Sequence, residues 1–107
     1  MSEQTDFITD VFSEFGPVKL KKMFGGHGVF FDGLMIGLLA DDQLYLKVDK
    51  QSVSQFEDNN LVQFSYDKNG KAVGMSYYQA PDSAMDDPSE MRDWAALAYG
   101  AARRAKK

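Results

Sequence analysis

The sequence predicts an α+β fold in which helices pack on one face of a single antiparallel sheet. Three observations predict it: an apolar stripe at helical period near the N-terminus, alternating strand-like segments joined by two-residue turns, and an alanine-rich stripe at helical period near the C-terminus. Tight hairpin turns join antiparallel strands, and helices with one apolar face need the apolar face of a sheet. The expected order is α–β(meander)–α–β–β–α in a single two-layer domain over residues 1–107.

The first expected element is a helix over about residues 4–15. Five apolar side chains recur there at helical spacing and form one stripe: Phe7, Ile8, Val11, Phe12 and Phe15. Gly16 and Pro17 follow directly, and the pair ends the helix because proline does not continue one. The stripe is expected to lie on the sheet.

Strands follow in a meander over residues 20–24, 29–31, 34–40 and 43–48. Asp32 and Gly33 supply a two-residue hairpin turn with positive φ. The segment from Gly25 to Gly28 is not assigned to a strand, because glycine weakens strand interiors. Its glycines are expected instead to allow positive φ or a close approach of the backbone.

The second half of the chain predicts a short helix, a hairpin and a long final helix. Asp49 is the expected N-cap of the short helix. Asn69 and Gly70 give the strongest hairpin signal in the chain, with alternating apolar residues on both sides. Asp87 is expected to cap the final helix in a capping box with Glu90. The buried face of that helix is expected to consist of Met91, Trp94, Ala95, Ala98, Ala101 and Ala102.

The composition limits the classes of protein to which the chain can belong. It contains no cysteine, which excludes disulfides and cysteine-bound zinc and fits a reducing compartment. The N-terminal segment lacks the basic and apolar regions of a secretory signal, and the longest apolar run, residues 34–40, is too short to cross a membrane. The formal net charge of −4 opposes nucleic-acid binding over the surface as a whole. We therefore expect a cytoplasmic protein without a membrane contact.

No set of residues predicts catalysis, a metal site or a cofactor site. His27 is the single histidine, and a catalytic base or a metal ligand needs oriented partners that the sequence does not mark. The glycines around it lack the Lys-Ser/Thr of a phosphate loop and precede a strand instead of a helix. We therefore predict that the protein is not an enzyme and has no cofactor. A small-molecule enzyme or sensor built around His27 stays an open alternative.

Aromatic side chains predict an interface. Tyr77 and Tyr78 are neighbours on a strand and therefore point to opposite faces of the sheet. The second ring is expected to pack beneath a helix or a subunit partner, and a surface that stacks nucleic-acid bases is the alternative. A two-layer fold leaves one sheet face poorly covered. The residues predicted to line that face and to form a homodimer interface are Phe30, Phe31, Tyr45 and Tyr78.

Basic residues cluster at residues 19–22 and at the C-terminus. A solvated strand edge and a soluble helix end explain both clusters, so direct binding to DNA is not expected. In the alternative interpretation, a nucleic-acid-binding protein, the phosphate contacts would be Arg103, Arg104, Lys106 and Lys107.

Several segments together resemble the N-terminal domain of the TfoX/Sxy family of competence regulators. The likeness covers about residues 12–104, and its Met-Phe-Gly-Gly and Ser-Tyr-Tyr segments in combination are fairly specific. The segments are Lys21 to Gly28, Leu44 to Lys47, Met75 to Tyr78 followed by Pro81, and Asp87 to Trp94.

The resemblance has consequences for fold and function. It implies a two-layer fold of the secretion-chaperone-like kind. It also implies a role in regulating competence genes, which full-length members have alongside the cyclic-AMP receptor protein, and therefore a transcription-regulator partner. The leading hypothesis is a non-enzymatic regulatory module that acts through protein contacts. The resemblance supplies no catalytic residues. Full-length members carry a second, C-terminal domain, so the chain is expected to be a stand-alone relative or an excised domain.

Overall fold

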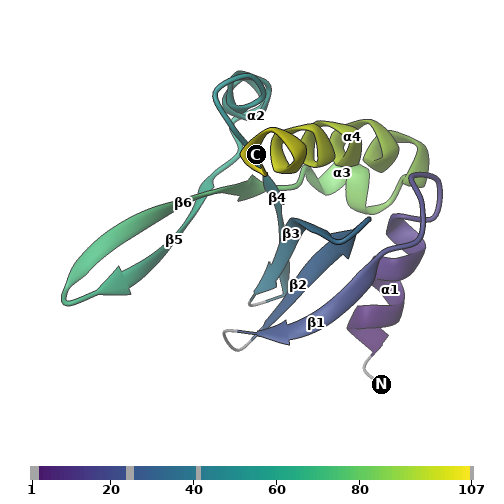
Figure 1. Cartoon of the computed structure of the whole chain (residues 1–107), viewed down its shortest axis with the longest axis horizontal. Helices are drawn as coiled ribbons and strands as arrows, with labels where there is room; N and C mark the ends of the chain where they lie inside the picture. Colours follow the sequence, from purple (N-terminus) through teal and green to yellow (C-terminus); the bar gives the residue numbers. More distant parts are fainter. Residues whose placement is uncertain (1–2, 24–25, 41, 107) are drawn as a thin grey trace.

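The computed structural model describes residues 3–23, 26–40 and 42–106, in which one six-stranded antiparallel sheet carries helices on one face (Figure 1). The strands are β1 (Lys19–Met23), β2 (Gly26–Phe31), β3 (Leu34–Ala40), β4 (Gln43–Lys47), β5 (Gln63–Lys68) and β6 (Lys71–Gln79). Their order across the sheet is β1-β2-β3-β4-β6-β5. The helices are α1 (Glu3–Val11), α2 (Val53–Asp58), α3 (Asp82–Met85) and α4 (Pro88–Ala105). The predicted α+β class with an antiparallel sheet is confirmed.

Helix α1 ends at Val11, before the predicted end near residue 15. The chain continues in a turn in which the amide of Gly16 donates to the carbonyl of Phe12 at 2.9 Å. Ile8, Val11 and Phe12 are buried in the core, but Phe7 is 46% exposed. Each residue advances a helix by about 100°, so Phe7 lies at the edge of the stripe and only its neighbours reach the sheet.

Strand β2 begins at Gly26, so the prediction that this segment lies outside the strands was wrong. A Cβ atom on Gly26 would lie 2.1 Å from the carbonyl oxygen of Leu39, and one on Gly28 would lie 2.9 Å from the Phe30 ring. Neighbouring groups approach the backbone so closely at these positions that a side chain would clash, which explains glycine within the strand. A close approach is one of the two roles expected for these glycines. Gly25 lies outside the described residues.

Both predicted two-residue hairpin turns are present. The φ angles are +52° at Asp32 and +78° at Gly33, and they are +54° at Asn69 and +80° at Gly70. Positive φ at both central residues is the type I′ geometry that matches the twist of antiparallel strands. These local signals therefore fix the β2–β3 and β5–β6 hairpins.

Replacing Gly70 by valine is expected to lower the free energy of unfolding by about 1–2 kcal/mol, because a left-handed conformation strains a branched side chain. Apart from its chain neighbours, no described atom lies within 4 Å of the Cβ position, so the backbone conformation alone would cause the loss. Gly70→Asn is the matched control, since asparagine tolerates this conformation. Urea titrations that give the two variants equal stability would contradict the assigned turn.

The structure shifts one predicted helix cap and keeps the other. Helix α2 begins after Ser52, not after Asp49. The Asp49 carboxylate instead accepts hydrogen bonds from the amides of Gln51 and Ser52 at 3.0 and 3.2 Å, so it shapes the turn that precedes the helix. At α4, Asp87 is the N-cap as predicted and accepts from the amide of Ser89 at 3.0 Å.

Glu90 does not complete the predicted capping box. Its carboxylate accepts hydrogen bonds from Ser83 Oγ at 2.7 Å and from Trp94 Nε1 at 3.3 Å. The short helix α3, which the sequence did not predict, supplies Ser83 and also supplies the Ala84 carbonyl that accepts from the amide of Asp87. Trp94 is half-buried. The rest of the predicted α4 face is buried, namely Met91, Ala95, Ala98, Ala101 and Ala102.

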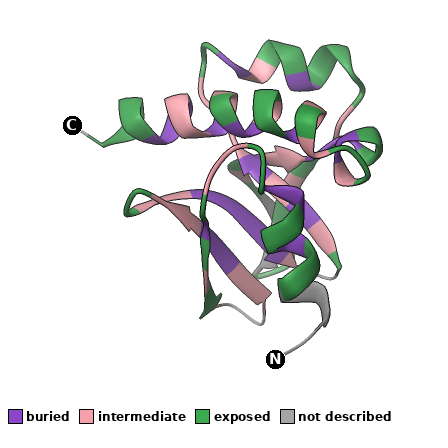
Figure 2. Cartoon of the chain, turned by 90° about the vertical axis from the view of Figure 1, so that its right-hand side faces the viewer, coloured by how far each residue is buried: buried purple, intermediate pink, exposed green. Residues whose placement is uncertain are grey.

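The core lies between the helices and one face of the sheet, and Figure 2 shows the buried segments of α4 and the strands facing each other. All four helices contribute to this single core, so they cover the same face. The opposite face is called the open face below. In the described part of the chain, no helix is long and apolar enough to cross a bilayer. The largest fully buried side chains are Phe12, Phe56, Ile8, Ile36, Leu44, Leu46 and Met91.

The β5–β6 hairpin projects away from the helices (Figure 1). Strand β4 pairs in register with Tyr77 to Gln79 of β6, and the amide of Val48 extends this ladder to the Ser76 carbonyl, whereas β5 follows β6 to the turn. The β5–β6 register shifts between Gln63 and Ser65. Irregularities of this kind bend a strand pair, so the hairpin leaves the plane of the other strands.

Candidate interaction surface

The open face carries buried and half-buried aromatic and aliphatic side chains. Register pairs Leu38 with Tyr45 and Lys47 with Tyr77, and directly paired residues share a face of the sheet. Leu38 and Tyr77 are buried, yet they lie outside the core that the helices cover. The Tyr45 and Phe64 rings meet edge to face, with centroids 4.8 Å apart. The open face is therefore a second apolar surface, distinct from the core.

These side chains surround an apolar groove of about 420 Å³, called the open-face groove below. Leu38 and Tyr77 are 4% and 7% exposed, and burial raises the pKa of the Tyr77 hydroxyl. The bent β5–β6 hairpin forms one wall of the groove and β3 forms another. Besides Gly26, the lining residues are Met35, Leu38, Ala40, Phe64, Met75 and Tyr77.

Lysines lie next to the open-face groove. The ammonium of Lys47 is 5.1 Å from the centre of the Tyr77 ring, and that of Lys21 is 5.5 Å from the centre of the Phe30 ring. Phe30 pairs in register with the lining residue Met35. Strands β1 to β4 contain four lysines and no aspartate or glutamate. The rest of the chain holds the other eight basic and all sixteen acidic residues, a net charge of −8.

The four residues predicted to form one interface are divided between the two faces. Phe30 and Tyr45 lie on the open face, as their register partners show. The Phe31 ring instead packs on the helix side, with centroid distances of 4.5 Å to Phe15 and 5.0 Å to Tyr99. Consecutive residues of a strand point in opposite directions, so Phe30 and Phe31 do not line the same surface.

Tyr78 also lies on the helix side. Its ring packs on Phe56 of α2, with centroids 6.1 Å apart, and its hydroxyl donates to the Glu57 carboxylate at 3.2 Å. Burial, together with that hydrogen bond, raises the pKa of the Tyr78 hydroxyl. The second tyrosine of the pair thus packs beneath a helix, as expected. Tyr45 and Tyr78 accordingly do not share a base-stacking surface.

Residues that the sequence did not single out form most of the open-face groove. Leu38 lies in β3, which is apolar throughout its length, so no alternation indicates which of its side chains face the helices. Phe64 and Met75 alternate with polar neighbours, but alternation alone does not identify the covered face. The pairing of β4 with β6 shows which side chains lie on the open face. This pairing joins segments that are distant in the sequence, so no local pattern reveals it.

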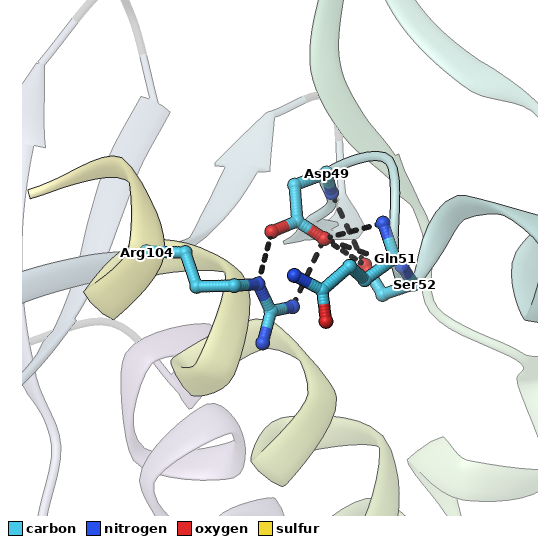
Figure 3. Close-up of polar contacts among 4 residues, drawn as sticks. All are labelled: Asp49, Gln51, Ser52 and Arg104. Atoms are coloured by element: carbon cyan, nitrogen blue, oxygen red, sulfur yellow. Dashed lines mark hydrogen bonds and ion pairs between the residues drawn. The ribbon is translucent and has the colours of Figure 1, made fainter.

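Arg104, a predicted phosphate contact in the alternative interpretation, forms an ion pair with Asp49 (Figure 3). Its Nε and Nη2 groups donate to the two carboxylate oxygens at 2.5 and 2.9 Å. The hydrogen bond from Arg104, followed by those from the Gln51 and Ser52 amides, lowers the pKa of Asp49 from 3.8 to about 2. This contact ties the last turn of α4 to the loop before α2.

The depressed pKa of Asp49 predicts a pH dependence of stability. The folded state holds its proton less tightly than the unfolded state, so the contribution is present above the unfolded pKa of 3.8 and is lost as the pH falls toward 2. Asp49→Asn and Arg104→Gln are both expected to reduce the loss of stability over this range. Arg103→Gln is the control. Urea titrations from pH 5 to about pH 2 test this, and an unchanged profile in Asp49→Asn would refute it.

Arg103 and Lys106, two of the other predicted phosphate contacts, line one pocket together with Tyr99, whereas Arg104 lines a different one. The guanidinium carbon of Arg103 lies 5.6 Å from the centre of the Tyr99 ring. Lys106 is the C-cap of α4, and its amide donates to the Ala102 carbonyl at 3.2 Å. Lys107 lies outside the described residues.

His27 is half-buried on β2, where its register partners are Lys22 and Leu39. Among the residues that the structure describes, no hydrogen bond or ion pair of its side chain is seen, and no three acidic, histidine or cysteine residues form a group that could hold a metal ion. The geometry therefore gives no support to a chemical site at this histidine.

Comparisons with known proteins give two matches. The model of a family described as the TfoX N-terminal domain matches residues 10–102. Protein Sxy of Escherichia coli (strain K12) is 26% identical over 68 residues. That match covers 64% of this chain and 32% of Sxy, so the matched segment spans about a third of the length of this relative.

Proposed function

Because the chain belongs to the TfoX N-terminal domain family, we propose that it is a non-enzymatic regulatory module that acts through protein contacts at its open-face groove. The resemblance noted in the sequence is confirmed by the family match. The family is regulatory and is not known for catalysis. The competence role implied by that resemblance is part of the proposal.

The open-face groove is the observation that carries this proposal. It is lined by thioether, aliphatic and aromatic groups. Concave apolar surfaces of this kind favour binding of an apolar segment of another molecule. The helix side, in contrast, uses its apolar groups for the core. A contact at the groove would therefore leave the core of the domain intact.

Transcript profiles of the native cell test the regulatory function. We expect deletion of the gene to change the transcripts of a defined set of genes, and the wild-type chain to restore them. Phe64→Asp, which places a charge in the groove, is expected to behave like the deletion. Ala96→Asp on an exposed position of α4 is the matched control and should restore the transcripts. Circular dichroism would establish that both variants fold. Unchanged transcripts in the deletion strain would refute the regulatory function.

Nucleic-acid binding through the C-terminal basic residues is the competing hypothesis. One of its four predicted contacts, Arg104, pairs with Asp49, and the chain has a net charge of −4. We expect no binding to duplex DNA tighter than about 10⁻⁵ M near physiological salt. Fluorescence anisotropy at several salt concentrations measures it, with a chain truncated after Ala102 as the control. Submicromolar binding that this truncation weakens would favour the nucleic-acid hypothesis.

A homodimer through the open face, as predicted from the sequence, is the competing occupant of the groove. A two-fold contact through the open face would bring the same patch of both subunits together, including Lys21 and Lys47. Such a dimer would place like charges together, and its association should strengthen with added salt. Sedimentation velocity at several protein and salt concentrations tests this, and a mass near the 12.0 kDa of one chain throughout would contradict it.

A further inference from the structure

We propose that the open-face groove binds an acidic segment of a partner protein, with the apolar side chains of that segment in the groove and its carboxylates beside Lys21 and Lys47. This inference rests on the proposed function and specifies the chemistry of the partner.

The lining of the groove indicates an apolar anchor. Leu38 and Tyr77 form its most buried part, and two methionines, Met35 and Met75, lie on separate strands of its lining. Methionine adapts its shape to different apolar surfaces and is common where proteins bind flexible segments. The Tyr77 hydroxyl is the polar side-chain group of this lining. Small-molecule sites usually offer several convergent polar groups, so this groove suits apolar side chains of a protein segment better.

The charges around the groove indicate an acidic partner. Strands β1 to β4 hold four lysines without a carboxylate, although the whole chain has a net charge of −4. Positive charge is therefore concentrated on the sheet and negative charge elsewhere. Lys21 and Lys47 form no ion pair with a described residue and lie over the rings of Phe30 and Tyr77. Carboxylates of a bound segment would complement these ammonium groups and orient the segment.

The same features disfavour two other occupants. A second copy of the chain, related by two-fold symmetry, would bring Lys21 and Lys47 near the same residues of its partner. Single-stranded nucleic acid needs flat aromatic faces for its bases. Here the Tyr45 ring meets Phe64 edge to face at 66°, and the groove beside them is lined partly by methionine, leucine and alanine.

Selection from a display library of random 12-residue peptides on the immobilised full chain tests this chemistry. We expect the selected peptides to combine aspartate or glutamate with leucine, isoleucine or aromatic residues. The double variant Lys21→Glu/Lys47→Glu should bind a selected peptide about tenfold or more weakly. Lys50→Glu, a charge reversal at an exposed position of the loop before α2, is the matched control and should bind like the wild type. Selected peptides without acidic residues, or equal affinities of all three proteins, would overturn the proposal.

Methionine methyl groups report where a selected peptide binds. In NMR spectra of the chain labelled with methyl-¹³C methionine, the signals of Met35 and Met75 should shift, while those of Met85 and Met91 on the helix side should not. Shifts confined to Met85 and Met91 would overturn the proposal. So would shifts of Met35 and Met75 that follow dilution of the protein alone, which would indicate a second copy. Displacement of the peptide by oligo-dT at lower concentration would indicate nucleic acid instead.

The two proposals fail in different ways. Transcripts that respond to gene deletion, combined with peptides that lack acidic residues, would leave the regulatory function standing and reject the acidic partner. Acidic peptides bound at Met35 and Met75, combined with unchanged transcripts, would support the acidic partner and reject the regulatory function.

Discussion

Replacing Phe12 by alanine is expected to lower the free energy of unfolding by about 3–5 kcal/mol, a large share of the roughly 5–15 kcal/mol that a domain of this size has. The Phe12 side chain is fully buried where the turn after α1 meets the core. Its ring packs edge to face on Phe15, with centroids 6.5 Å apart. Truncation would remove the buried apolar surface and leave a cavity, and both effects destabilise the fold.

Phe7→Ala is the matched control for this prediction, because it removes the same ring from a residue five positions earlier in the sequence. Phe7 is 46% exposed, so its truncation should cost about 1 kcal/mol or less. Urea-induced unfolding, followed by the fluorescence of the single tryptophan Trp94, compares the two variants. Equal losses would mean that α1 presents a different face to the sheet than the structure assigns.

Replacing Gly26 by alanine is the second large perturbation. The added Cβ atom would lie 2.1 Å from the carbonyl oxygen of Leu39, which belongs to the backbone of β3, so β2 and β3 would have to move apart. Overpacking of this kind costs about 1–3 kcal/mol, and a clash with backbone favours the upper end. Gly26 also lines the open-face groove, so the variant should lose affinity for the selected acidic peptides.

Gly28→Ala separates this clash from the general effect of adding a methyl group to β2. Its Cβ atom would meet side-chain atoms of Phe30 and Met23, the nearest at 2.9 Å, and these side chains can move. The loss of stability should therefore be smaller than for Gly26→Ala. Urea titrations of both variants decide the matter, and a larger loss for Gly28→Ala would contradict the described pairing of β2 with β3.

Most secondary structure could be predicted because its causes are local. Asn69 and Gly70 determine a type I′ turn through their own backbone preferences, and Asp87 caps α4 through amides two and three residues away. The end of α1 was predicted too late because helical spacing continues to Phe15, whereas the chain turns at Phe12. Strand β2 was predicted too short because glycine is required at position 26 by the backbone of Leu39 on β3. No local pattern in the sequence connects Gly26 with Leu39.

The candidate site could be predicted only in part. Phe30 and Phe31 are consecutive on β2, and consecutive strand residues point to opposite faces of the sheet. The reasoning applied to Tyr77 and Tyr78 therefore already shows that Phe30 and Phe31 cannot line the same surface. Asp49 and Arg104 are separated by 55 residues, so no local signal in the sequence indicates their ion pair. This ion pair occupies the guanidinium of Arg104, which was predicted to contact phosphate. The open-face groove depends on the bend of the β5–β6 hairpin, which the register shift near Gln63 accompanies.

The pairing of β6 divides the sheet into parts of different cooperativity. Between Gly74 and the turn at Asn69, the described strand pairing of β6 is with β5 alone, and an isolated two-stranded hairpin is marginally stable. Its amides should therefore exchange with solvent through local opening, while those of β3 and β4, which α4 covers, should require global unfolding. Phe64 and Met75 lie where this hairpin joins the sheet. The wall of the groove formed by the hairpin can therefore adjust its shape to different bound segments, while the wall formed by β3 stays fixed.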